Sequence, residues 1–142
     1  MRPVGPGPGP HGASGTMAGA FMVLLFGVHA FLGVWGLIGF VEWFSDSTPW
    51  PRVSNPLFPR DILFMQWSLV LAASVLFIGG HALRWEHTPA AMACVYAAMA
   101  ALCAVQTFTW LKGDLRFVAM GAEYAAYAVI LLFLFRRGSG GG

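Results

Sequence analysis

Four long apolar segments, separated by polar or proline-rich stretches, dominate the hydrophobic pattern of this chain. Each segment approaches or exceeds the ~20 residues that a helix needs to cross the hydrocarbon core of a bilayer. The predicted spans are residues 18–41, 61–83, 90–111 and 117–135. The short link at 84–89 favours an antiparallel hairpin of the second and third spans. The pattern therefore predicts an all-α, integral membrane four-helix bundle, antiparallel up-down, with both termini on the same side.

The composition is that of a membrane protein and argues against a nucleic-acid partner. Of the 142 residues, 58% are hydrophobic and only 10% are charged, which is too apolar for a soluble domain of this size. The net charge of +2 is not clustered, so we expect no nucleic acid and no polybasic lipid-binding segment. Lysine and arginine divide evenly between the two sides of the predicted bundle, so the positive-inside rule leaves its orientation open.

The predicted four-span transmembrane domain covers residues 17–137 and is flanked by two short tails. Residues 1–16 repeat glycine and proline without an apolar face, which is typical of a flexible or polyproline-like tail. Residues 138–142 form a Gly/Ser tail directly after the basic pair Arg136 and Arg137.

The one sizeable loop, residues 42–60, contains prolines that prevent it from continuing a helix. Its apolar side chains Trp43, Trp50, Leu57 and Phe58 are unusual for a freely solvated linker. They predict a partner-facing loop, and the alternative is an interfacial aromatic belt on the membrane surface.

One carboxyl group, that of Glu123, lies inside the last predicted span. An ionised carboxylate is costly in hydrocarbon, so Glu123 should face the protein interior and find hydrogen-bond donors or hold a proton. Tyr127 lies one helical turn further on, and Gln66 and Gln106 lie at a similar depth in the antiparallel arrangement. Together with His29 near the midplane, these side chains form a predicted intramembrane polar line.

Three interpretations of this polar line remain open. As structural glue, interhelical hydrogen bonds of ~1 kcal/mol each would hold the bundle together. In a small proton-coupled transporter, Glu123 would bind and release protons. In a haem- or quinone-associated subunit, His29 would be the cofactor-binding residue, as an axial ligand or a quinone partner.

The third predicted span has two unlike faces. The small side chains are Ala90, Cys94, Ala97, Ala98 and Ala101, and the large ones are Met92, Tyr96, Met99, Cys103, Gln106 and Trp110. Small residues let helix backbones approach closely in a membrane. We therefore expect the small-residue face to pack against a neighbouring helix.

Recognisable catalytic motifs are missing from the sequence, which contains no HExxH, no Gly-rich phosphate loop and no CxxC pair. We predict no catalytic or metal-binding residue. The expected function is that of a non-catalytic accessory or scaffolding subunit of a larger membrane complex, with a respiratory or photosynthetic energy-transducing assembly as the favoured host. The expected partners are membrane lipids, including structural lipids, and other membrane subunits. The expected location is a bacterial inner, mitochondrial or thylakoid membrane.

Overall fold

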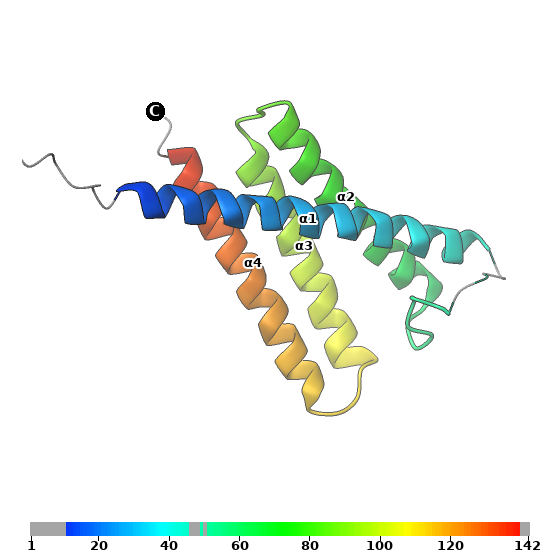
Figure 1. The fold of residues 1–142 in the computed structure, drawn as a ribbon. Helices are drawn as coiled ribbons and strands as arrows, with labels where there is room; N and C mark the ends of the chain where they lie inside the picture. The colour runs from blue at the N-terminus through cyan, green and yellow to red at the C-terminus, as the bar shows by residue number, and fades with distance from the viewer. Residues whose placement is uncertain (1–10, 46–48, 50, 140–142) are drawn as a thin grey trace, which may run out of the picture.

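The computed structural model describes residues 11–45, 49 and 51–139. This part of the chain is all-α, with four long helices and no strand. The helices are α1 (His11–Phe44), α2 (Arg60–Ala82), α3 (Thr88–Thr109) and α4 (Leu115–Ser139) (Figure 1).

Each of the four helices is long and apolar enough to cross a membrane, which indicates an integral membrane protein. The prediction of four apolar helices is therefore confirmed, and the boundaries of α2 and α3 agree with it to within two residues. The first helix differs, because α1 begins at His11 inside the segment predicted as a tail. Pro10 is the last proline before the loop, so no proline between residues 11 and 44 interrupts a helix. Residues 1–10 and 140–142 of the predicted tails lie outside the described residues.

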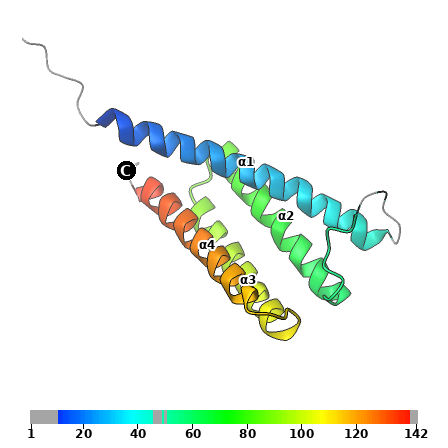
Figure 2. The ribbon, with the colours of Figure 1, turned by 60° about the horizontal axis from the view of Figure 1, so that its bottom comes forward.

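Helix α1 lies over the other three helices and crosses them obliquely (Figures 1 and 2). It packs mainly along α2, α2 packs on α3, and α3 packs on α4. The beginning of α1 also approaches the end of α4, where the rings of Phe21 and Phe133 meet edge to face with centroids 4.7 Å apart. The described part of the chain thus forms a layered assembly in which α4 is the least covered helix.

All four helices contribute to one apolar core. Its buried members are Leu25 from α1, Ala73 and Phe77 from α2, Met92 and Tyr96 from α3, and Leu134 from α4. Phe77 and Met92 are fully buried. Phe77, Met92 and Leu134 all lie close to the helix ends at the α2–α3 connection and at the end of α4, so the core lies toward that end of the assembly.

Glycines on one face of α1 allow α2 to approach closely. Gly39 faces the indole ring of Trp67, and a Cβ atom at Gly39 would overlap that ring. One turn earlier, a Cβ atom at Gly36 would contact Val70. A Cβ atom at Gly33 would overlap the Ser74 hydroxyl group. This close approach explains why Trp67, a large side chain, is only 1% exposed.

The packing of α3 contradicts the expectation from its small residues. Ala97, Ala98 and Ala101 are exposed in the single chain, whereas Met92 and Tyr96 on the opposite face are buried. The backbones of α1 and α3 do not pack against each other, so large side chains of α3 rather than alanines reach the core beneath α1 and fill it. The small-residue face of α3 is therefore exposed, and its residues Ala98 and Ala101 line an open groove beside α2.

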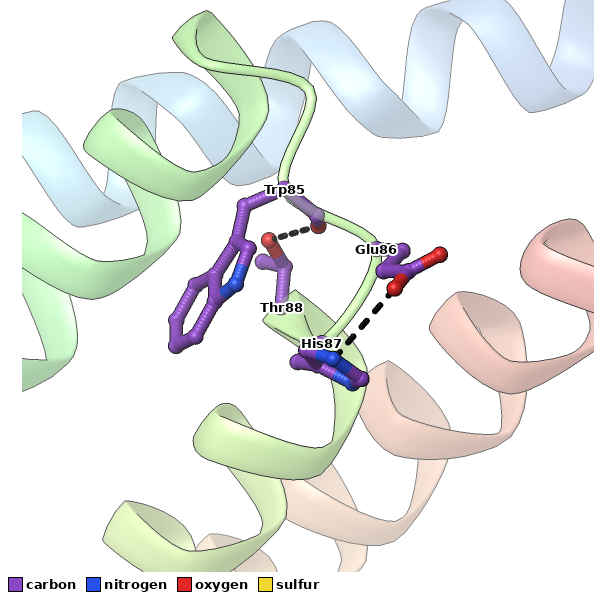
Figure 3. A network of polar contacts seen from close by, with 4 residues as sticks. All are labelled: Trp85, Glu86, His87 and Thr88. Carbon is purple, nitrogen blue, oxygen red and sulfur yellow. Dashed lines mark hydrogen bonds and ion pairs between the residues drawn. The ribbon is translucent and has the colours of Figure 1, made fainter.

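The connection between α2 and α3 is closed by its own hydrogen bonds (Figure 3). The Thr88 hydroxyl donates to the Trp85 carbonyl at 2.6 Å, and the Thr88 N–H donates to the same oxygen at 3.1 Å. Thr88 also fills the space above Gly80, where any Cβ atom would clash with it. His87 and Glu86 form an ion pair at 3.4 Å, but both side chains are largely exposed, so the pair adds little stability.

Candidate functional site

His29 lies at the centre of the assembly and is fully buried. Its Nδ1 atom is 2.8 Å from the Leu25 carbonyl, which can only accept, so Nδ1 carries the proton. In the neutral ring the Nε2 atom is then an acceptor, and the Tyr96 hydroxyl donates to it at 2.8 Å. The imidazole also stacks on the Phe77 ring, with centroids 3.9 Å apart and planes 9° apart. We call His29 and Tyr96 the histidine pair.

This geometry limits what His29 can bind. A haem iron needs the free lone pair of an imidazole nitrogen, and that lone pair already accepts the Tyr96 hydrogen bond. A quinone oxygen needs a donor, and the Nδ1–H already donates to Leu25. Either cofactor would have to displace an existing partner of a fully buried side chain. Among the described residues, no group of three or more His, Cys, Asp or Glu side chains is placed to hold a metal ion.

A second polar group lies between α2, α3 and α4. The Tyr127 hydroxyl donates to Oε1 of Glu123, one turn earlier on α4. The Gln106 amide donates from Nε2 to Oε1 of Gln66 at 2.8 Å, which ties α3 to α2. We call Glu123, Tyr127, Gln66 and Gln106 the carboxyl cluster. Its thiol neighbour is Cys103 on α3, which interacts with Glu123.

Three of the four residues of the carboxyl cluster line a small, partly open cavity of about 120 Å³. Glu123, Gln66 and Gln106 all line it, together with Cys103 and apolar side chains of α2 and α3. The structure thus brings to one place the three polar side chains that the sequence puts at a common depth.

The histidine pair and the carboxyl cluster meet at their tyrosine rings. The rings of Tyr96 and Tyr127 stack with centroids 4.6 Å apart and planes 14° apart. Within the described part of the chain, no hydrogen bond joins the two hydroxyl groups. Stacked ring carbons do not pass protons, so the residues of the predicted polar line belong to three separate hydrogen-bonded pairs, His29 with Tyr96, Tyr127 with Glu123, and Gln106 with Gln66.

The loop residues predicted to face a partner differ in their contacts. Trp43 donates from Nε1 to the Arg60 carbonyl at 3.0 Å and lies under the Arg60 guanidinium group, so it closes the loop internally. Phe58 is half-buried and meets the Trp110 ring edge to face. Leu57 is 60% exposed and is available to a partner. Trp50 lies outside the described residues.

Two side chains missing from the sequence-based prediction have central roles. Tyr96 supplies the donor to His29, but the sequence puts Tyr96 six residues into its predicted span and His29 eleven residues into its own, so a common depth does not identify the pair. Glu42 ends the first span, and its carboxylate accepts from the N–H groups of Val53 and Ser54 at 2.6 and 2.9 Å. That contact folds the loop back onto α1. No local sequence pattern around Glu42 predicts it.

Comparison with protein-family models, curated proteins and solved structures finds no match to this chain.

Proposed function

We propose that this chain is a non-catalytic accessory or scaffolding subunit of a larger membrane protein complex, inserted as an antiparallel bundle with both termini on one side. The observation that carries this proposal is the exposure of small side chains on the outer helices. Ala119, Ala122 and Ala126 of α4 are exposed, and so is the alanine face of α3.

Exposed helix faces made of small side chains favour contact with other helices over contact with lipid. Lipid-facing helix surfaces have no need of small side chains, whereas helix–helix contacts in membranes are enriched in them because the backbones can then approach closely. Inside this chain α1 and α2 use glycines in this way. The small-residue faces of α3 and α4 are unused within the chain, which is expected of a subunit whose partners are other membrane proteins.

The site geometry supports a non-catalytic role less directly. The histidine pair has each ring nitrogen satisfied and the ring held on Phe77, an arrangement that stabilises the core rather than one prepared for a substrate. The energy-transducing membrane remains our favoured host, on the general ground that its complexes contain small spans without catalytic motifs.

The decisive experiment is native mass spectrometry of the protein extracted from its own membrane in a mild detergent. We expect it to leave the membrane with other subunits or as an oligomer. The double variant Ala122→Leu and Ala126→Leu should lose these partners, because larger side chains keep the helices apart. Leu132→Phe, at an exposed large residue of the same helix, is the matched control. A wild-type protein that is extracted only as a monomer would refute the proposal.

A further inference from the structure

We propose that the cavity in the carboxyl cluster is a hydrated proton-binding site whose protonatable group is Glu123. This inference is independent of the accessory role, because it concerns the polar side chains between α2, α3 and α4 rather than the small side chains on the exposed helix faces.

The cavity is large and polar enough to hold water. A water molecule needs ~10–15 Å³ on the same measure and two to four polar partners. The cavity measures about 120 Å³, and carboxyl and amide groups converge on it from three helices. Gln66 and Gln106 use one amide atom each for their mutual bond, so each keeps a further polar atom for cavity water.

The surroundings of Glu123 contain neutral partners and no counter-ion. On α4 it faces Tyr127, and Tyr124 beside it donates to the Ala100 carbonyl at 2.7 Å. On α3 and α2 it faces Cys103, Gln106 and Gln66. In the described part of the chain, no lysine or arginine forms an ion pair with it.

The nearest positive charge along α4 is Arg116. It lies seven residues before Glu123, about 10 Å away along the helix axis. Its guanidinium group donates to the Leu111 carbonyl and lies over the Phe117 ring, so it is already engaged elsewhere. Arg116 therefore forms no ion pair with the Glu123 carboxyl group in the described part of the chain.

This set of neutral partners can accommodate both protonation states. The carboxylate accepts from the Tyr127 hydroxyl and from cavity water, whereas the carboxylic acid keeps one acceptor oxygen for Tyr127 and donates its proton to water. The histidine pair is different, since its proton is fixed between two protein partners. Glu123, unlike the histidine pair, thus keeps carboxyl oxygen capacity facing the cavity.

Labelling with an apolar carbodiimide tests the proposal, because this reagent partitions into the membrane and adds to the protonated carboxyl group. In the purified full chain, mass spectrometry should find the adduct at Glu123, with a rate that falls as the pH rises. Glu123→Gln should remove the adduct. Tyr127→Phe should increase the labelling rate at neutral pH about tenfold, because the carboxylate form loses a hydroxyl donor. Tyr124→Phe is the matched control and should leave the rate unchanged.

A second measurement keeps the proposal falsifiable if the reagent does not reach the cavity. Infrared difference spectra between acidic and alkaline samples should contain a carboxylic-acid carbonyl band that is absent in Glu123→Gln. A wild-type spectrum without that band, or a band that does not change with pH, would overturn the proposal. Either result would mean that Glu123 does not exchange a proton, whatever the outcome of the association experiment.

Discussion

His29 on α1 and Tyr96 on α3 are joined by a 2.8 Å hydrogen bond, although the backbones of these two helices do not pack against each other. The bond crosses the apolar core beside Phe77, and it satisfies the one acceptor atom of a fully buried imidazole. Side chains rather than backbones therefore connect the first and third helices.

Removing the Tyr96 hydroxyl group should destabilise the protein. Tyr96→Phe leaves Nε2 of His29 buried without a donor, so the free energy of unfolding should fall by about 1–2 kcal/mol. Equilibrium unfolding in mixed micelles measures this change. Tyr124→Phe is the control, because its hydroxyl group is exposed and should contribute much less. Equal losses in the two variants would show that the buried bond has no special value.

Gly39 should tolerate no side chain. In Gly39→Ala the added methyl group overlaps the rigid Trp67 ring, so we expect a loss of about 1–3 kcal/mol in the free energy of unfolding. Gly27 on the same helix has nothing near its Cβ position, and Gly27→Ala should be neutral or slightly stabilising. A Gly39→Ala protein as stable as Gly27→Ala would contradict the close packing of α1 on α2.

The proposed topology can be tested by accessibility labelling of single cysteines in intact membrane vesicles. We use exposed positions at the ends of the helices and replace Gly15, Glu86, Gly138, Leu57 or Lys112 one at a time. A water-soluble thiol reagent should label positions 15, 86 and 138 from one side of the membrane and positions 57 and 112 from the other. Any different grouping is inconsistent with four antiparallel spans.

Leu57 should contribute to partner binding without contributing to folding. Leu57→Ser removes an exposed apolar side chain and should weaken association about tenfold, while the thermal unfolding midpoint in detergent stays unchanged. Leu83→Ser is the control, since Leu83 is equally apolar and even more exposed but lies in the connection between α2 and α3. Unchanged co-purification of partners with Leu57→Ser would exclude the loop as a docking surface.

At Glu123 the polarity of the side chain should matter for stability, and its charge should not. Glu123→Gln keeps an acceptor for the Tyr127 hydroxyl and should preserve the unfolding midpoint. Glu123→Leu removes that acceptor and should cost about 1–3 kcal/mol. Glu86→Gln and Glu86→Leu, at a surface glutamate, should both be neutral. If Glu123→Leu were as stable as the wild type, the carboxyl cluster would have no structural role.

Much of the candidate site could be predicted from the position of each residue within its span, counted from the loop end. Gln66, Gln106 and Glu123 lie at the same distance from the loop ends of their spans, and in the structure they line one cavity. The donor to His29 could not be identified in the same way, because α1 crosses the other helices obliquely and depth alone does not tell which side chain it meets. The contact between the loop and Glu42 could not be predicted from the sequence either. It joins Glu42 to residues 11 and 12 positions further on, and the donors are backbone N–H groups, which every residue except proline has.

The sequence by itself determined four apolar helices and the approximate bounds of the second and third, because in hydrocarbon each segment must satisfy its own backbone hydrogen bonds and proline interrupts them. Only the tertiary structure decided which face of α3 is buried. The backbones of α1 and α3 do not pack against each other, so Met92 and Tyr96 reach the core beneath α1, and the alanines are exposed. The shape of that core depends on three other helices at once, so no local pattern in α3 contains it.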